Sequence, residues 1–272
     1  MTANPGGLPE LECYYDTAPR AGGARAEDFG PLTLFVQESD GWPYYARPAL
    51  GGAEVSAADV ERVLARQREL EVPESFEWVA ETTPSLRAAV EAAGLNVHAH
   101  PLMVLDPAAA SVRLPADPDV RVLGAADPLL RSAVTVPMLA FAAPGTAVGE
   151  GGPAELAVAA VDPASEARRV RVSGMIASAR TALAAAVREG AVLCSGQYIP
   201  VGDVAEVVGV GTLPSARRQG LGLAVTAALV ADALAHGART VFLSAGDEDV
   251  ARIYGRLGFR RVGTALIAER PL

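Results

Sequence analysis

The chain of 272 residues contains no lysine, so all 23 of its basic side chains are arginines. This absence excludes a lysine Schiff base, a lysine general base and a phosphate-binding loop of the G-x-x-x-x-G-K type. Aromatic residues make up only 5% of the chain, whereas half of it is apolar. We therefore expect a sizeable core that is built mainly from Ala, Val and Leu.

Cysteine is almost as scarce, because Cys13 and Cys194 are the only two and lie far apart in the sequence. A disulfide framework is not expected, and a four-cysteine metal site is excluded. His98 and His100 share one face of a predicted strand, but no third ligand lies near them. The sequence therefore implies no metal.

The formal charge of −9 argues against binding to nucleic acid. It is compatible with a cationic substrate, although acidic surfaces also serve solubility. Residues 1–12 lack a basic and then apolar leader, and the most apolar helix, around Leu221 to Ala235, is too short to span a bilayer. These features predict a cytoplasmic protein with no membrane partner. Whether it is a monomer or a homodimer stays open.

Strand and helix patterns alternate in the first half. Leu32–Val36, Phe76–Ala80 and Asn96–Leu105 are expected strands, and a helix is expected from Ala57 to Leu70 with Ser56 as its N-cap. Residues 1–30 are rich in Gly, Pro and charged residues. Trp42–Pro43–Tyr44–Tyr45 is the densest aromatic patch, and it either packs structurally or lines a pocket.

Residues 106–119, which are rich in Pro, Ala and Asp, are the best candidate for a linker. We therefore expect two domains, at 1–110 and 118–272. The second half reads as one strand, two helices, three strands, a helix, a strand, a helix and a closing strand pair at 260–269. The fold class is thus a mixed α/β (α+β) sheet.

Chemistry is concentrated between Val207 and His236. Gly209 and Gly211 follow a strand, but Pro214 stands where a dinucleotide-binding motif needs its third glycine. The stretch Arg217–Arg218–Gln219–Gly220–Leu221–Gly222 is better suited to a phosphate. Its glycines let backbone N–H groups approach an anion at the start of a helix, and its arginines add charged donors.

This stretch closely resembles the acetyl-CoA-binding signature of the GNAT superfamily of N-acetyltransferases, Q/R-x-x-G-x-G/A after a bulged strand. The resemblance covers roughly residues 118–270. It implies that residues 217–222 hold the CoA pyrophosphate. It also implies that backbone groups of Val210, Gly211 and Thr212 pair with the pantetheine as an added strand.

A second family motif is matched by Asp247, Tyr254 and Gly258–Phe259, which resemble N-x-x-A-x-x-x-Y-x-x-x-G-F. The resemblance makes Tyr254 the general acid that reprotonates the CoA thiolate. The alternative is that Tyr254 only packs under the sheet. Asp247 stands at the usual asparagine position; it can accept hydrogen bonds from pantetheine but cannot donate them, or it is only a helix N-cap.

Glu206 lies eleven residues before Arg217 on the same predicted strand. In several GNAT branches a glutamate at this offset deprotonates the amine, and an alkylammonium must lose a proton before it can attack. Glu206 is therefore the candidate base, with a solvated strand residue as the alternative.

Residues 76–105 resemble the closing strand–helix–strand portion of a GNAT unit, but no cofactor loop precedes them. The resemblance thus implies a degenerate first copy without a CoA loop, in tandem with a catalytic second copy. The acceptor of the catalytic copy would be a small, unidentified compound, whose primary amine attacks acetyl-CoA directly. The competing hypothesis is a non-catalytic acyl-CoA-binding or sensor module.

Overall fold

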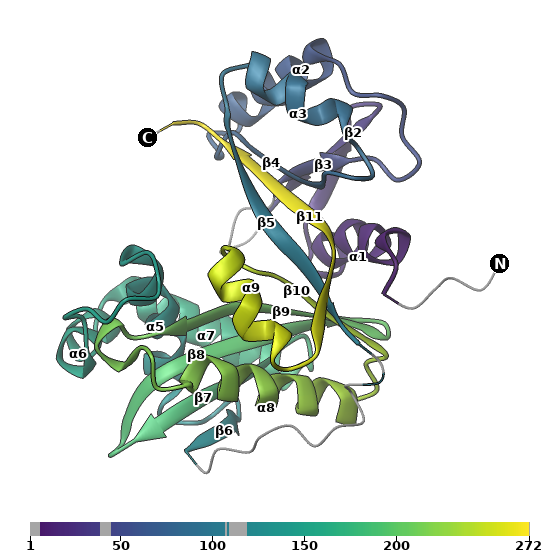
Figure 1. Cartoon of the computed structure of the whole chain (residues 1–272). Helices are drawn as coiled ribbons and strands as arrows, with labels where there is room; N and C mark the ends of the chain where they lie inside the picture. The colour runs from purple at the N-terminus through teal and green to yellow at the C-terminus, as the bar shows by residue number, and fades with distance from the viewer. Residues whose placement is uncertain (1–5, 39–44, 107, 109–118, 272) are drawn as a thin grey trace. The chain divides into compact units, whose positions relative to one another are not determined.

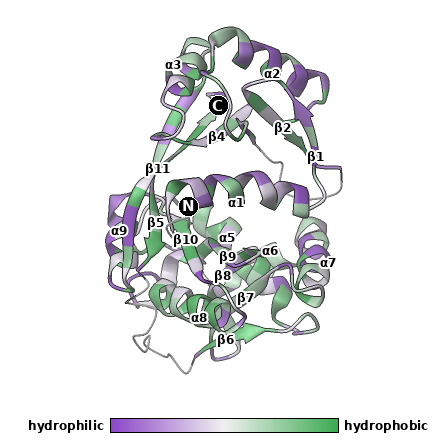
Figure 2. Cartoon of the chain, turned by 90° about the vertical axis from the view of Figure 1, so that its right-hand side faces the viewer, coloured by the Kyte–Doolittle hydropathy of each residue, from purple (hydrophilic) through white to green (hydrophobic). Residues whose placement is uncertain are grey.

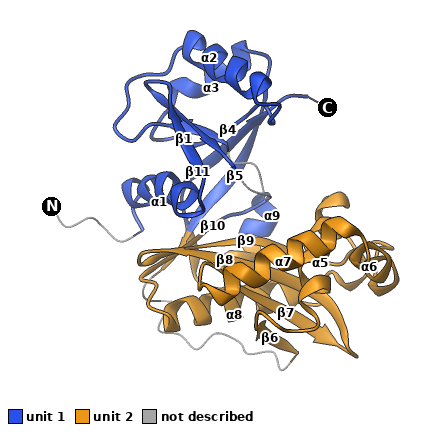
Figure 3. Cartoon of the chain, turned by 180° about the vertical axis from the view of Figure 1, so that it is seen from behind, with its two compact units in different colours: residues 1–103, 244–251, 261–272 blue, residues 104–243, 252–260 orange. Residues whose placement is uncertain are grey.

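The computed structural model describes residues 6–38, 45–106, 108 and 119–271. Figure 1 shows the course of the chain, and Figure 3 shows its division into two compact units. Unit 1 comprises residues 1–103, 244–251 and 261–272, and unit 2 comprises residues 104–243 and 252–260. The expected domains, 1–110 and 118–272, differ from these units near the C-terminus, where two short segments belong to unit 1.

Unit 1 begins with a helix and a three-stranded antiparallel meander. Its elements are α1 (Leu8–Ala21), β1 (Arg25–Asp28), β2 (Leu32–Val36), β3 (Ala46–Pro48), α2 (Ala57–Glu69), β4 (Ser75–Val79), α3 (Ser85–Ala92) and most of β5 (Asn96–Leu105). β1 pairs with β2 and β2 with β3 in antiparallel fashion, whereas β3 and β4 are parallel. The unit is therefore built on a mixed sheet.

The core of unit 1 lies between this sheet and the helices α2 and α3. It is formed by buried side chains of β2, α2, β4 and α3, with Phe76 and Trp78 as its largest members. The C-terminal strand β11 (Phe259–Glu269) contributes Leu266 and Ala268 to the same core. Its end pairs antiparallel with β4, so that Leu266 lies opposite Trp78. A single strand thus stands where the sequence suggested a closing strand pair.

Helix α1 and strands β1 and β3 are additions to the expected elements. α1 holds Pro19 inside its last turn and is flanked by glycine-rich sequence, features that usually mark an irregular segment. It is stabilised nevertheless, because Leu11, Tyr14 and Tyr15 bury their side chains. Of the aromatic patch at residues 42–45, only Tyr45 is among the residues that the structure describes.

Unit 2 contains β6 (Val120–Leu123), α5 (Leu130–Ala142), α6 (Pro153–Ala160), α7 (Pro163–Ala177), β7 (Ala182–Arg188), β8 (Ala191–Val201), β9 (Val204–Thr212), the 3-10 turn η1 (Pro214–Ala216), α8 (Leu221–Ala235) and most of β10 (Thr240–Ser244). Helix α9 (Glu248–Gly255) contains residues of both units. Strands β6 to β9 form an antiparallel meander, and β9 then pairs parallel with β10. Figure 2 shows α8 mostly in the green of apolar residues, as suits a helix that packs on β7, β8 and β9.

Three helices, where two were expected, connect β6 to β7. Helix α6 ends at Ala160, and helix α7 begins at Pro163. Asp162, between them, accepts a hydrogen bond from the N–H of Ala164 at 2.7 Å. An aspartate N-cap followed by proline is a strong helix-start signal, so the break has a local cause.

Helix α5 packs tightly on the opposite face of the sheet from α8. Pro137 within α5 has no N–H, which leaves the carbonyl of Ala133 without its helical partner. The buried hydroxyl of Ser195 on β8 donates to that carbonyl at 2.6 Å. A side chain at Gly211 of β9 would place its Cβ 2.9 Å from atoms of both Pro137 and Ala140. The bond from β8 and the glycine on β9 therefore hold α5 close to the sheet.

Candidate active site

A β-bulge interrupts β9 just before its end. Ser195 of β8 lies opposite Gly211 and Gln197 lies opposite Val208, so two residues of β9 face a single residue of β8. Gly209, inside this bulge, has a φ of +64°, a conformation that glycine adopts without strain. The bulge redirects the last residues of β9, which are the residues expected to pair with pantetheine.

The other side of β9 is paired over only part of its length. β10 pairs with Val204, Ala205 and Glu206, and the register ends at Phe242 with Glu206. Within the described residues, no pairing of β10 with β9 is found beyond that point. Beyond Glu206, the edge of β9 opposite to β8 therefore has no strand beside it in the described residues. Backbone groups of Val210 and Thr212 lie on this edge, as strand addition requires.

Helix α8 begins with an uncapped N-terminus. Its N-cap, Gly220, has a φ of +79° and supplies no side-chain hydrogen bond, while its carbonyl accepts from the N–H of Ala224 at 3.0 Å. The N–H groups of Leu221 and Gly222 point out of the first turn, where a helix has no internal acceptors. A side chain added at Gly222 would meet only the Thr212 hydroxyl, at 3.6 Å. Donors and open space thus coincide here, an arrangement suited to an anion.

The Arg217 side chain lies on helix α5. Its guanidinium donates to the carbonyl oxygens of Ala140 at 2.9 Å, Ala143 at 2.6 Å and Ala147 at 3.1 Å. The first two carbonyls belong to the C-terminal end of α5, where helix carbonyls lack internal partners and a cation is favoured. The structure therefore places this guanidinium on α5, whereas the sequence motif suggested a direct contact with pyrophosphate.

Arg218 and Gln219 are exposed and differ in their contacts. Arg218 has a φ of +67°, and no partner of its guanidinium is found in the described part of the chain. The side-chain oxygen of Gln219 accepts a hydrogen bond from Arg188 at 2.8 Å. Arg188 also donates to Asp119 at 2.6 Å. Arg218 is consequently the arginine of this loop whose charge is available to a ligand.

Tyr254 is only 9% exposed and lies in a small polar group on the α8 side of the sheet. It hydrogen-bonds with Thr226 of α8, which donates in turn to the carbonyl of Gly222 at 2.8 Å. Burial, together with the electrostatic influence of Cys194, raises the pKa of Tyr254 to about 12. Tyr254 therefore keeps its proton at neutral pH and can donate it.

The sequence did not single out Thr226 or Cys194 as members of this group. Cys194 is fully buried and accepts a hydrogen bond from Thr212 at 3.2 Å, and burial raises the pKa of its thiol to about 12. Thr226 lies four residues after Gly222, one helical turn further along α8. This four-residue spacing is the feature of the sequence that could have predicted the contact of Thr226 with Gly222.

Glu206 projects from the opposite face of β9. Tyr198, which lies opposite Val207, donates its hydroxyl proton to Asp232 of α8 at 2.9 Å, so Val207 faces α8. Because neighbouring strand residues alternate, Glu206 faces the side of α5. Its side chain is half-buried. The candidate base and the candidate acid thus stand on two different faces of the sheet.

Asp247 caps helix α9. Its carboxylate accepts a hydrogen bond from the N–H of Val250 at 2.8 Å, and its carbonyl accepts from the N–H of Ala251 at 2.9 Å. This is the helix-cap role that the sequence left as an alternative to contact with pantetheine. Asp247 belongs to unit 1.

Two kinds of feature are absent from the described residues. No group of three or more His, Cys, Asp or Glu side chains could hold a metal ion there. In the same residues, every helix is too short or too polar to cross a bilayer.

Comparison with known proteins points to one family. The model of the acetyltransferase (GNAT) family matches residues 160–259, which include the bulged strand, the glycine loop and Tyr254. None of the curated proteins matches the sequence. Similar solved structures include a GCN5-related N-acetyltransferase from Kribbella flavida, with 24% identity, a TM-score of 0.69, and 98% of this chain and 97% of that chain covered.

Two further structures share the fold along most of their length. One is a putative GNAT acetyltransferase from Novosphingobium aromaticivorans, with 19% identity, a TM-score of 0.53, and 93% of this chain and 94% of that chain covered. The other is a tandem GNAT protein from the clavulanic acid biosynthesis pathway, with 14% identity, a TM-score of 0.55, and 97% and 96% covered. At these identities the likeness concerns the fold.

Proposed function

Residues 160–259 carry a domain of the GNAT family of acetyltransferases, and we propose that the chain transfers an acetyl group from acetyl-CoA to a primary amine of a small acceptor. The observation that carries this proposal is the uncapped N-terminus of α8, which follows the bulged strand β9 after one short loop. Both features lie within the matched residues.

The cofactor end of the proposed site is supported by the fit of α8 to a pyrophosphate. N–H groups of Leu221 and Gly222 would donate to its oxygens, and the open space at Gly222 would admit it. Arg218 would add a charged donor from the rim. Arg217 would act indirectly, by anchoring the loop to α5.

The strand end of the site is supported by the free edge of β9. Backbone groups of Val210, Gly211 and Thr212 would hold the pantetheine amides, as an added strand does. The acetyl carbonyl would then lie near the bulge, where an N–H of β9 stabilises negative charge that develops on its oxygen.

Acetyl-CoA supplies an activated thioester, and the chain would supply the proton transfers around it. Glu206 would accept a proton from the incoming ammonium, directly or through water, so that the neutral nitrogen forms the new C–N bond. Tyr254 would donate its proton to the departing sulfur as the C–S bond breaks. The placement of the two groups on different faces of the sheet supports this division, because the base acts on the incoming amine and the acid acts on the departing sulfur.

The raised pKa keeps the hydroxyl of Tyr254 protonated at neutral pH, so that a proton is present when the sulfur departs. The donor thus stays protonated through the binding steps. Its proton would return from the solvent or from the acceptor side after the product leaves.

The acceptor class is supported by charge and chemistry. A formal charge of −9 favours the approach of a cationic amine over that of an anion. Metal chemistry and nucleic-acid binding form no part of the proposal.

A direct experiment is a coupled binding and turnover measurement. Isothermal titration with acetyl-CoA tests the cofactor loop, and incubation with a panel of small amines, followed by mass spectrometry, tests transfer. Binding with formation of acetylated amine supports the proposal. Binding without product would favour the acyl-CoA sensor, and absence of binding would contradict both.

A further inference from the structure

The elements of unit 1 repeat those of unit 2 in order and pairing. Unit 1 runs α1, β1, β2, β3, α2, β4, α3, and unit 2 runs α7, β7, β8, β9, α8, β10 and then α9. In each unit three antiparallel strands are followed by a parallel pair, β3 with β4 and β9 with β10. The loop after β3 therefore corresponds to the loop after β9, which carries the proposed cofactor site.

The corresponding helix in unit 1 is closed to an anion. Ser56 accepts from the N–H of Asp59 at 3.3 Å, and the carboxylate of Asp59 accepts from the N–H of Ser56 at 2.8 Å. The N–H of Val55, just before, donates to the hydroxyl of Ser85 at 3.1 Å. A carboxylate thus already occupies the place that a phosphate would take, so α2 cannot bind CoA as α8 would.

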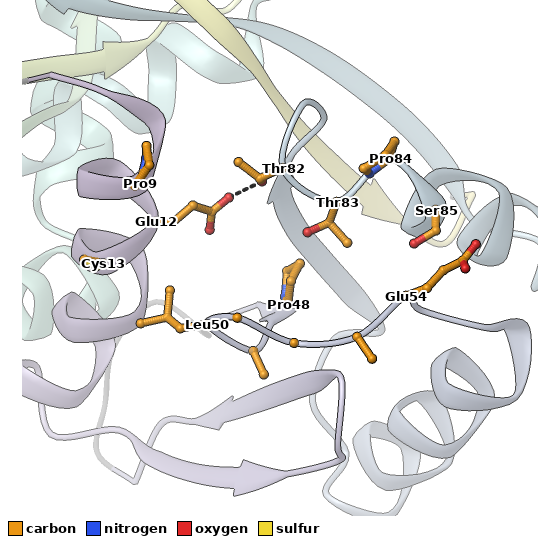
Figure 4. Close-up of a pocket in the computed structure, with 14 residues that line it drawn as sticks. Pro9, Glu12, Cys13, Pro48, Leu50, Glu54, Thr82, Thr83, Pro84 and Ser85 are labelled. Atoms are coloured by element: carbon orange, nitrogen blue, oxygen red, sulfur yellow. Dashed lines mark hydrogen bonds between the residues drawn. The ribbon is translucent and has the colours of Figure 1, made fainter. Parts of the chain in front are cut away.

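A cavity of about 830 Å³ nevertheless lies at this position in unit 1 (Figure 4). It is lined by Pro9, Glu12 and Cys13 of α1, by Pro48 at the end of β3 and residues 49–54 after it, and by residues 82–85 after β4. The parallel pairing of β3 with β4 consists of Ala46 opposite Phe76, so the two strands separate directly before the lining loops. The volume is in the range of sites for small molecules.

The charges that line this cavity are all negative. Of its fourteen lining residues, Glu12 and Glu54 alone are ionisable carboxylic acids, and none is arginine or histidine. One oxygen of Glu12 accepts a hydrogen bond from Thr82, as Figure 4 shows, and no partner for its other oxygen is found among the described residues. Arg47 lies near but is held by Glu77.

A cation in the cavity would stabilise the charged carboxylate of Glu12. Burial raises the pKa of its carboxyl above the usual value, because desolvation outweighs the hydrogen bond from Thr82 and the attraction of Arg47. A carboxylate that has lost water without gaining a full set of partners is stabilised by an ammonium group, which supplies both charge and N–H donors.

We propose that this cavity of unit 1 binds a small organic cation with one or two ammonium groups, held by Glu12 on the wall and Glu54 at the rim. The cavity occupies the place of a cofactor site whose preference has changed from anion to cation. The proposal goes beyond the transfer reaction, and its test requires no acyl donor.

Cys13 provides a local readout, because it is exposed and lines the cavity, whereas Cys194 is fully buried. The rate at which iodoacetamide alkylates Cys13 in the folded full-length chain is measured by mass spectrometry. The probe is 1,4-diaminobutane, and 1,4-butanediol serves as its neutral control of equal length. Diaminobutane should slow the alkylation and bind in isothermal titration, and butanediol should do neither.

Variants locate the binding. Glu12→Gln should weaken diaminobutane binding by roughly tenfold or more, whereas Glu61→Gln, on the exposed face of α2, should leave it unchanged. An unaltered alkylation rate without ligand shows that Glu12→Gln keeps the cavity folded. Glu54→Gln, at an exposed position, should weaken the binding of diaminobutane more than that of butylamine, which has a single ammonium group. This variant tests the proposal even if Glu12→Gln does not fold.

Three results would overturn the proposal. They are equal protection of Cys13 by butanediol, no protection by either compound, and full protection in both Glu12→Gln and Glu54→Gln. Loss of diaminobutane binding in Glu206→Gln alone would instead assign the amine to the proposed catalytic site of unit 2 and would equally contradict a site in unit 1.

Discussion

Arg217 and Arg218 are adjacent in the sequence, yet the structure gives them separable roles. Arg217 donates three hydrogen bonds to carbonyl oxygens at and beyond the end of α5. The guanidinium of Arg218 is exposed at the rim of the loop. We predict that Arg217→Met lowers the stability of the protein, whereas Arg218→Met lowers its affinity for CoA.

The magnitude follows from the three contacts. A hydrogen bond from a charged donor contributes about 1.5 to 3 kcal/mol. The contacts to Ala140 and Ala143 are partly buried, whereas the contact to Ala147 is exposed, and water can replace part of each when the side chain is truncated. We therefore expect Arg217→Met to lower the free energy of unfolding by about 2 to 3 kcal/mol, the value of one strong bond and not of three.

Arg218→Met is the matched control, because it removes the same charge one residue away. Its effect on the free energy of unfolding should stay within about 0.5 kcal/mol. The backbone at position 218 has a φ of +67° in an arginine already, and methionine leaves that strain unaltered. Urea unfolding in the absence of CoA measures both variants.

The affinity for CoA then completes the comparison. Isothermal titration should show roughly tenfold weaker binding for Arg218→Met, with a smaller dependence on salt, since a phosphate contact has been lost. The reasoning would be refuted if Arg217→Met unfolded like the wild type and instead showed the weaker, less salt-dependent binding. That result would assign the Arg217 guanidinium to the pyrophosphate, as the family motif first suggested.

Three further substitutions test other parts of the account. Tyr254→Phe should lower kcat by about 10² or more without a comparable change in KM. In the wild type, the free energy of unfolding should also fall as the pH rises from about 10 to about 12, because the unfolded chain loses the proton of Tyr254 before the folded chain does. Urea titrations at each pH should show a smaller fall in the variant. Glu206→Gln should lower kcat/KM most at low pH and recover as the amine itself deprotonates, which a pH–rate profile measures; a uniform loss at every pH would argue against a base. Gly211→Ala should lower the unfolding free energy by about 1 to 3 kcal/mol, since its Cβ would lie 2.9 Å from Pro137 and Ala140, and an unchanged urea midpoint would show that α5 packs less closely.

Much of the fold could be predicted because local patterns determine it. The strands at Leu32–Val36 and Asn96–Leu105 match their predicted limits, and Ser56 caps α2 with the expected hydrogen bond. Such elements depend on alternating apolar residues or on cap chemistry, both of which are local. The predicted fold class, a mixed α/β sheet of GNAT type, is confirmed.

What escaped prediction depends on distant contacts. The pairing of β11 with β4 joins residues far apart in sequence, and nothing local in Leu266 indicates that it enters the core of unit 1. Similarly, the motif that contains Arg217 specifies a residue type but not the direction of its side chain, which depends on the carbonyls of α5. The roles of Glu206 and Tyr254 stay predictions.

The most direct test of the central claim is the acetylation of an amine by the purified chain. Mass spectrometry should follow the acetylated product and free CoA together, because the exposed thiol of Cys13 would consume thiol reagents. We predict that the two products form in equal amounts, with a rate that depends on the amine and falls in Tyr254→Phe. Acetyl-CoA that binds but stays intact with every amine of the panel would contradict the account.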